Sequence, residues 1–268
     1  MNTTTGPVLP APGPAYPADD VRWTWRHRLR CHWLEARCEC LRLLRTPSFA
    51  IPSLLFPALF YVLFGVVLNR GSGDAARYLL ATYGVFGVMG AGLFGFGVTV
   101  AIERERGFLT WKRALPMPPG AYLQAKLVMA LMFASAIAAL VATIGATLGG
   151  VTLGPGQWAL LYAVHVLGVL PFCALGLWIG TLVGGQGAAV VVNLLYLPMA
   201  FLSGLWLPLA MLPGWLAKLA PVWPSYHHAQ LALKVVGMDA GGRTVIHLGA
   251  LVAATAVFFL LARRRLRG

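Results

Sequence analysis

Two clusters of side chains in this sequence are of types that could do chemistry. The first combines Cys31 and His32 with Cys38 and Cys40, and thiolate and imidazole groups are zinc ligands in many proteins. Their spacing matches no common zinc pattern, and residues seven apart, such as Cys31 and Cys38, simply share one face of a helix. No metal site is therefore predicted. The fourth cysteine, Cys173, lies in an apolar run, so no disulfide framework is indicated.

The second cluster is His227–His228 beside Tyr226. Histidine is a common general acid or base, so an integral membrane enzyme that modifies lipid could use these residues together with His165 or His247. Such a site would need a carboxyl group nearby, and the long apolar runs of the sequence contain no acidic residue. A polar pair at a membrane interface is the commoner role, and the lipid-modifying enzyme remains an alternative.

Motifs for nucleotide, peptide and ester hydrolysis are missing from the chain. It contains no G-x-x-x-x-G-K-[ST] phosphate loop, no H-E-x-x-H and no G-x-S-x-G. Its apolar runs also lack the acidic residues that proton- or sodium-coupled carriers place near the centre of the membrane. The chain is therefore predicted not to be an enzyme, and coupling to an ion gradient is disfavoured.

The composition indicates a protein whose solvent is lipid. Of the 268 residues, 59% are hydrophobic and 11% are charged, whereas soluble domains carry about 25% charged residues. A soluble fold of this size could not bury so much apolar surface. The net charge of +13 comes from basic residues between the apolar runs, so the predicted partner is membrane lipid and not nucleic acid.

Hydropathy predicts an all-α membrane protein with six transmembrane helices. A helix needs about 20 apolar residues to cross the hydrocarbon core, and backbone groups in lipid must be paired within the helix. Glycines recur along the second span and favour close packing within one chain over a seam between two copies. The predicted spans are residues 48–68, 79–101, 125–149, 158–182, 187–207 and 244–262, within a transmembrane domain over 47–268.

The distribution of Lys and Arg sets the orientation. Sixteen of them lie before the first span, between the second and third spans, or after the sixth, and five lie in the other connections. Basic residues favour the cytoplasmic side of a membrane. Both termini are therefore predicted to lie in the cytosol.

The chain before the first span divides into two parts. Residues 1–21 are polar and rich in proline, and we expect a disordered tail because there is little to bury. Residues 22–46 are predicted to form an amphipathic interfacial helix that lies on the membrane surface. The side chains that mark this helix are Trp25, Leu29, Trp33 and Arg37.

The connection at residues 208–240 is too long and too patterned for a simple outer loop. Its prolines interrupt helices repeatedly, and its aromatic residues fit a belt at the outer membrane interface. Short re-entrant helices that dip into the outer leaflet are predicted here. The residues that carry this prediction are Pro213, Trp215, Pro221, Pro224 and Tyr226.

The most informative connection joins the second and third spans. It begins with alternating charges, continues with an apolar stripe and ends in a proline-rich stretch, which predicts a short amphipathic helix over about 103–116 that lies across the cytoplasmic face. We expect Glu103 and Glu105 to pair with arginines of a cytosolic partner or of the N-terminal helix. The predicted partner-binding residues are Glu103, Arg104, Glu105, Arg106, Gly107, Leu109, Trp111 and Pro116.

This connection resembles that of the ABC-2-type permeases, the membrane subunits of ATP-driven exporters. In that family the second span runs into an E-R-x-x-G-x-L segment, and a proline and a basic residue that opens the third span follow. The corresponding residues here are Glu103-Arg104-Glu105-Arg106-Gly107-Phe108-Leu109, Leu115-Pro116 and Lys126. The outer segment is also similar, with Leu212-Pro213-Gly214-Trp215-Leu216 and Pro224-Ser225-Tyr226. Phe108 departs from the family, because many relatives carry a small or polar residue there.

The resemblance implies a half-transporter. The chain would be a permease that exports a hydrophobic or amphipathic small molecule, such as a drug, an antibiotic or a lipid-like compound, across the bacterial cytoplasmic membrane. It would pair with a second copy or a homologue, and the helix at 103–116 would be the coupling helix on which a cytosolic ABC ATPase docks. No cofactor is expected in this chain, since ATP and Mg would bind to the ATPase. The alternatives within the family are an exporter of a lipid-linked glycan or polysaccharide, and an ATP-driven sensor.

Overall fold

The computed structural model describes residues 24–267, except residues 70, 116 and 119. All regular structure in this part of the chain is helical, so the predicted all-α class is confirmed. The tail predicted at 1–21 and the first residues of the predicted 22–46 helix lie outside the described residues. The helices are α1 (Trp25–Leu44), α2 (Pro47–Phe60), η1 (Tyr61–Val67), α3 (Gly73–Gly90), η2 (Ala91–Val98), α4 (Thr99–Glu105), α5 (Phe108–Ala114), α6 (Ala121–Thr147), α7 (Pro155–Leu167), α8 (Leu170–Leu182), α9 (Gly185–Leu202), η3 (Leu209–Met211), α10 (Gly214–Ala217), η4 (Ala220–Val222), α11 (Pro224–Val235) and α12 (Thr244–Arg267).

Six helical stretches of the described chain are long and apolar enough to cross a membrane, so the predicted number of spans is confirmed. Several spans are built from consecutive helices: α3, η2 and α4 form the second, and α7 and α8 form the fourth. The six stretches are Pro47–Val67, Gly73–Glu105, Ala121–Thr147, Pro155–Leu182, Gly185–Leu202 and Thr244–Leu266.

The second span is longer than hydropathy predicts. Its helix begins at Gly73, where the Ser72 hydroxyl caps the first turn by accepting a hydrogen bond from the Ala75 N–H at 3.3 Å. It continues to Glu105, beyond both limits of the expected 79–101. The additional turns carry charged residues, which is why a search for apolar runs does not include them.

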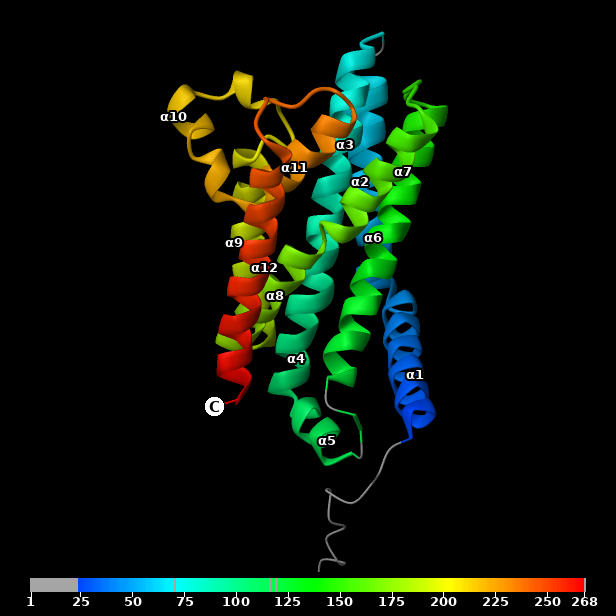
Figure 1. The fold of residues 1–268 in the computed structure, drawn as a ribbon, viewed down its shortest axis with the longest axis vertical. Helices are drawn as coiled ribbons and strands as arrows, with labels where there is room; N and C mark the ends of the chain where they lie inside the picture. Colours follow the sequence, from blue (N-terminus) through cyan, green and yellow to red (C-terminus); the bar gives the residue numbers. More distant parts are fainter. Residues whose placement is uncertain (1–23, 70, 116, 119, 268) are drawn as a thin grey trace, which may run out of the picture.

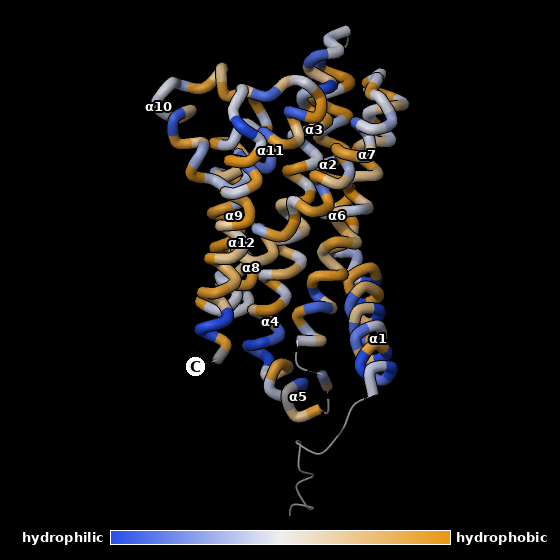
Figure 2. The backbone as a smooth tube through the Cα atoms, in the orientation of Figure 1, coloured by the Kyte–Doolittle hydropathy of each residue, from blue (hydrophilic) through white to orange (hydrophobic). Residues whose placement is uncertain are grey.

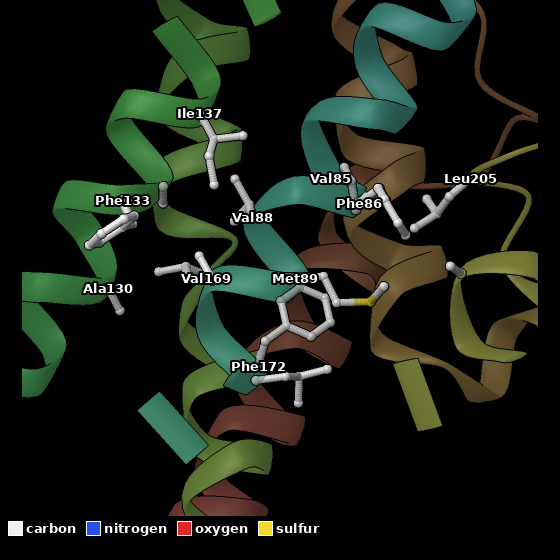
Figure 3. Packing of buried hydrophobic residues seen from close by; sticks show 14 of the residues in the cluster. Val85, Phe86, Val88, Met89, Ala130, Phe133, Ile137, Val169, Phe172 and Leu205 are labelled. Atoms are coloured by element: carbon white, nitrogen blue, oxygen red, sulfur yellow. The ribbon is translucent and has the colours of Figure 1, made fainter. Parts of the chain in front are cut away.

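The second span also forms the centre of the bundle. Of the most apolar 18-residue stretch of this span, 78% is buried inside the protein, compared with 17% of the corresponding stretch of the sixth span. Its glycines allow close approach: a Cβ on Gly97 would lie 2.6 Å from the Gly176 Cα, and one on Gly92 would lie 2.7 Å from the Phe172 Cβ. Figure 3 shows the apolar side chains that pack between the second span and its neighbours. These glycines therefore serve packing within the chain, as the sequence favoured.

The fourth span is broken near its middle. The helix α8 begins three residues after the end of α7. At the break, Gly168 faces His228 of α11, since a Cβ on this glycine would lie 2.1 Å from the ring Nε2. The sequence predicts one uninterrupted helix at 158–182, because hydropathy does not register a break between two apolar helices.

The two ends of the bundle differ in what they carry. The beginning of α1, the short helix α5 and the C-terminal end of α12 lie at one end (the α5 end), and α10, α11 and the loops around them lie near the other (the α10 end; Figure 1). Apolar residues dominate the middle of the bundle, and hydrophilic residues gather on α1 and toward the two ends (Figure 2). The even number of spans thus brings both ends of the described chain to the same end of the molecule.

The segment predicted as re-entrant, 208–240, contains the short helices η3, α10, η4 and α11. The longest of them, α11, packs against α3, α7 and α12. Just before this segment, Tyr78 of α3 donates a hydrogen bond to the Gly204 carbonyl at 2.7 Å, which fixes its start against the second span. The depth of these helices in a membrane stays a prediction.

Candidate functional site

The predicted coupling helix at 103–116 has two structural parts. Residues Glu103–Glu105 form the end of α4 and continue the second span, and α5 is a separate short helix. Gly107 joins the two parts with a φ of +71°, a left-handed conformation that side chains other than glycine rarely adopt. The structure thus replaces one expected helix by a helix end, a glycine turn and a second helix. Pro116 lies outside the described residues.

Lys126 is the centre of a buried ionic network at the α5 end. It lies in the second turn of α6, and its side chain is fully buried. Its ammonium group donates hydrogen bonds to Glu39 Oε1 at 2.5 Å, to Glu103 Oε1 at 2.7 Å and to Thr99 Oγ1 at 3.1 Å. The network therefore joins α6 to α1 and to the last helix of the second span.

Arg42 of α1 balances the charge of this network. Its guanidinium lies 2.6 Å from Glu39 Oε1 and 2.5 Å from Glu103 Oε1, so two cations face two carboxylates. Tyr122 donates a further hydrogen bond to Glu103 Oε2 at 2.5 Å. Burial lowers the pKa of Arg42, but Glu103 and Glu39 outweigh burial and leave this pKa raised. The pairing of Glu103 with an arginine of the N-terminal helix, one of the two expectations, is thus confirmed.

Arg104 and Glu105 tie the second span to the connection between α8 and α9. Arg104 donates hydrogen bonds to the carbonyls of Thr181 at 2.5 Å and Val183 at 3.2 Å, at the end of α8. The Glu105 carboxylate accepts a hydrogen bond from the N–H of Gly185, the first residue of α9, at 2.5 Å. A cation at a helix C-terminus and an anion at an N-terminus both complement the helix dipole. Both residues, predicted to bind a partner, therefore make structural contacts within the chain.

The exposed aromatic side chains of the predicted partner site lie on α5. Trp111 is 57% exposed, and its ring centroid lies 5.5 Å from that of Phe108. Leu109 is half-buried and lines a cavity of about 370 Å³ beside α5, which Leu266 at the end of α12 also borders. Arg106, in the turn before α5, is exposed. These residues are the part of the predicted site that remains available to another molecule.

Lys112 anchors α5 to the helices behind it. Its ammonium group pairs with Glu35 of α1 and lies over the rings of Phe108 and Tyr122, at 5.2 and 5.1 Å from their centroids. Burial lowers the pKa of Lys112 to about 8, and the charge of Lys126 acts in the same direction. The short helix is thus held to both α1 and α6 by charged contacts.

The remaining predicted residues lie on α1 and in the outer segment. On α1 the exposed residues include Trp25, Leu29, Trp33 and Arg37. The face of α1 that packs against α6 is a different one, where Ala36 and Leu43 are buried. In the outer segment Pro213, Trp215 and Pro221 are exposed, and Pro224 and Tyr226 are half-buried. The contact of either group with lipid stays a prediction.

The four histidines of the enzyme alternative form two pairs. The ring centroids of His165 and His228 are 5.9 Å apart, and His227 Nδ1 lies 3.0 Å from His247 Nδ1. The nearby Asp239 is paired with a lysine at 3.6 Å. The described residues contain no group of three or more His, Cys, Asp or Glu side chains placed to hold a metal ion. Asp239, an acid that acts on His247, is therefore held in an ion pair with Lys234.

A groove of about 470 Å³ lies between α2, the second span and α9. Aromatic side chains, including Phe56, Phe94 and Tyr196, form much of its wall, and Asn193 supplies a polar group. Tyr196 donates a hydrogen bond to the Phe86 carbonyl at 3.1 Å and so fixes α9 against the second span. Only 28% of the most apolar 18-residue stretch is buried in the first span, and the same fraction is buried in the fifth. Both spans therefore expose most of their side chains.

Sequence reasoning misses the acidic residues of α1. Glu35 and Glu39 are absent from the predicted site, although each makes an ion pair in the structure. Acidic residues are rare in this chain, which has eight of them, and these two lie one helical turn apart in a strongly basic segment. This rarity could have indicated that both have a specific role. The sequence identifies Lys126 as the basic residue that opens the third span. Its complete burial could not be predicted, because it depends on the packing of three helices.

Comparison with known proteins places this arrangement in a family. The family model described as "ABC-2 type transporter" matches residues 33–236, from the middle of α1 to the end of α11. The chain belongs to the ABC-2 type transporter family. A protein of Bacillus subtilis (strain 168), named "Putative transport permease YvfS", is 30% identical over 229 residues, which are 84% of this chain and 92% of that protein.

Membership in the ABC-2 family fixes the class of the protein. The six apolar helices are those of a multi-pass membrane protein, and the chain is the membrane subunit of a transporter. An ABC-2 permease is not itself the enzyme of its system and works in general with an ATPase partner. The ionic network and α5 both lie within the matched region.

Proposed function

We propose that this chain is the permease subunit of an ATP-binding-cassette exporter in the bacterial cytoplasmic membrane, with its α5 end in the cytosol. The excess of Lys and Arg on this side of the spans supports the orientation. ATP and Mg bind to a separate cytosolic ATPase, which docks on α5.

The observation that carries the proposal is the exposed aromatic pair on α5. Phe108 and Trp111 are exposed, whereas the nearby Arg104, Glu105 and Lys112 are used for contacts within the chain. Aromatic anchors that become buried on binding dominate the energetics of most interfaces. Because α5 is separated from the central span by a single turn, a displacement of α5 by the ATPase acts directly on the centre of the bundle.

The network around Lys126 gives the second point of mechanical contact. It joins α1, the second span and α6 through three buried charges, on Lys126, Glu39 and Glu103, and through the partly exposed Arg42. Separating these helices would leave charges unpaired in a low-dielectric environment, which costs several kcal/mol for each ion. The three helices therefore move together when α5 is displaced, and α1 slides on the membrane surface with its exposed tryptophans in lipid.

The groove between α2 and α9 supplies the path for cargo. Its aromatic, uncharged walls suit a hydrophobic or amphipathic small molecule, such as a drug, an antibiotic or a lipid-like compound. A second copy of the chain, or a homologue, covers the exposed faces of the first and fifth spans and closes this path in a dimer. A lipid-linked glycan is the alternative cargo, because the same aromatic rings could stack on sugars.

The lipid-modifying enzyme is less well supported by the buried histidines. Both ring nitrogens of His165 lie against backbone carbonyls, Leu161 at 2.8 Å and Ala81 at 3.0 Å. The Nε2 of His228 lies 3.1 Å from the Val164 carbonyl. The contacts with the Ala81 and Val164 carbonyls join helices to one another, and both ring nitrogens of His165 are engaged, which leaves none free for proton transfer.

Co-purification with an ABC ATPase of the same genome tests the proposal. We expect a stable complex whose ATP hydrolysis rises with lipophilic compounds and not with lipid-linked glycans. Stimulation by glycans instead would reassign the cargo. Stimulation without accumulation of any compound in inverted vesicles would identify the ATP-driven sensor. Failure of the chain to bind any such ATPase would contradict the proposal.

A further inference from the structure

Two histidine rings from different elements converge at the α10 end. His227 belongs to α11 and His247 to the first turn of α12, and their Nδ1 atoms lie 3.0 Å apart. The Nε2 of His227 lies 2.9 Å from the Pro221 carbonyl oxygen. Because this oxygen can only accept, Nε2 carries the hydrogen, and the Nδ1 of the neutral ring presents a lone pair toward His247.

His247 approaches from the other side in a matching way. Its ring makes a hydrogen bond with the Gly241 backbone, and Gly242 lies so close that a Cβ there would be 3.1 Å from its Nε2. Each ring is therefore oriented by a backbone group while its Nδ1 faces the other ring. Proteins orient metal-binding histidines by this means, through a hydrogen bond from the second ring nitrogen to a carbonyl or carboxylate.

We propose that His227 and His247 form a binding site for a divalent transition-metal ion, with Zn²⁺ as the representative. Zinc binds imidazole nitrogen at 2.0–2.1 Å, so two nitrogens on a tetrahedral ion are about 3.3 Å apart. The observed separation of 3.0 Å requires an opening of about 0.3 Å. Since the described residues offer no third protein ligand in a cluster with these two, water fills the remaining coordination positions.

The charges around the pair permit a cation. Lys234 and Asp239 both act on His247, and they pair with each other at 3.6 Å. The Lys234 ammonium also donates a hydrogen bond to the Gly242 carbonyl at 2.7 Å. The ring of Tyr226 packs beside both imidazoles, with centroids 5.3 Å from His227 and 5.9 Å from His247. The neighbourhood thus carries no unbalanced positive charge from these side chains.

A bound ion would join α11 to α12. The sixth span is the least buried of the six, with 17% of its most apolar window inside the protein. A metal bridge at its first turn therefore adds a cross-link to the span with the smallest buried fraction, and it raises the thermal stability of the chain. The site goes beyond transport, since it needs neither the ATPase nor a cargo.

Titration of the full-length purified chain with zinc sulfate at pH 7.5 tests the site, by calorimetry and by thermal denaturation. We expect saturable binding and a rise in Tm in the wild type. Each of His227→Gln and His247→Gln should weaken binding by about tenfold or more and abolish the rise in Tm. His227→Cys, which keeps a zinc ligand, should retain both. At pH 5 protons compete for the imidazoles, so zinc binding should fall in the wild type.

A matched control separates this site from the thiols of α1. A variant in which His32 becomes Gln and Cys31, Cys38 and Cys40 become Ser should keep the zinc-dependent rise in Tm. Loss of that rise in this control, or unchanged zinc affinity in both His227→Gln and His247→Gln, would overturn the proposal. Loss in His227→Cys as well as in His227→Gln would also overturn it, because the ligand would then not be what matters.

Discussion

Lys126 is cut off from water, and its charge is balanced by side chains of other helices. Glu39 and Glu103 contact it directly through their Oε1 atoms, Arg42 contacts the same two oxygens, and Tyr122 donates a hydrogen bond to the other oxygen of Glu103. Buried ion pairs contribute little relative to apolar packing, but removing one member leaves an uncompensated charge. The network is therefore a strict constraint on how α1, the second span and α6 can be arranged.

Lys126→Met is predicted to destabilise the chain by about 3–5 kcal/mol, since two buried carboxylates then face Arg42 alone. Thermal denaturation in detergent measures the effect. Lys218→Met, at an exposed lysine, is the matched control and should leave Tm nearly unchanged. Adding Glu39→Gln to Lys126→Met restores the charge balance and should recover part of the loss. An unchanged Tm in Lys126→Met would show that the network is not holding the helices together.

Trp111→Ala is predicted to lower cargo-stimulated ATP hydrolysis in the complex with the ATPase, because an exposed aromatic anchor is lost. A hot-spot residue of this kind contributes about 2 kcal/mol or more to binding, or roughly thirtyfold in affinity. Trp215→Ala, at the exposed tryptophan of α10, is the control. Normal stimulation by Trp111→Ala at normal membrane levels would rule out α5 as the docking helix.

The residue types in the connection between the second and third spans indicate that it is a functional segment, but they do not predict which helices its side chains contact. Alternating charges on a short helix usually face water, so Glu103 and Arg104 were natural candidates for binding a partner. Their actual positions depend on α1, α6 and α8, which are separate elements of the chain. No local pattern contains this information. The prediction for Trp111 is better founded, because a large apolar residue in a polar connection has fewer structural uses.

Among the elements, the second span determines the positions of the others. Its inward glycines face several neighbours, such as α8 at Gly92 and Gly97 and the side chain of His165 at Gly84. Such contacts place helix backbones closer together than any larger residue would allow. The consequence is that the centre of the bundle is sensitive to the addition of a single methyl group.

Gly97→Ala is predicted to lower Tm, since its Cβ would lie 2.6 Å from the backbone of Gly176, which cannot move aside as a side chain could. Overpacking of this kind costs about 1–3 kcal/mol. Gly249→Ala in α12 is the matched control, because nothing lies within 4 Å of its Cβ position. Alanine favours a helix more than glycine does, so the control should keep or raise Tm. Equal effects of the two substitutions would contradict the close contact.

Hydropathy predicts the number of spans because the cost of polar groups in lipid is large and local. It does not predict where a span breaks. The interruption at Gly168 and the π-helical stretches at Tyr61–Val67 and Ala91–Val98 lie within apolar runs, which hydropathy treats as continuous. The separation of α5 from α4 has a local cause in Gly107, and the positive φ of this glycine could have been anticipated from the sequence.

For the molecule as a whole, the two ends have different chemistry. The α5 end carries the ionic network, the basic helix α1 and the exposed aromatic pair. The α10 end carries the prolines, the short helices and the histidine pairs. This polarity, and not any single residue, supports a cytosolic position for the α5 end.

Accessibility of two engineered cysteines tests this orientation. In a variant without the four native cysteines, a membrane-impermeant maleimide is predicted to label Trp215→Cys in intact cells, and Trp111→Cys after the membrane is opened. Both tryptophans are exposed in the chain, so burial does not explain a difference. The experiment is done without overexpressed ATPase, which would cover α5. The reverse pattern would place the α5 end outside.

The contrast in burial between the second and sixth spans also limits how this sequence can change over time. Because 78% of the most apolar stretch of the second span is buried, a substitution on almost any face of this helix disturbs a neighbouring helix. The sixth span, at 17%, can exchange most of its side chains for other apolar ones without disturbing a neighbour. Sequence drift should therefore concentrate on the rim of the bundle, and two relatives could differ widely there while sharing one central helix.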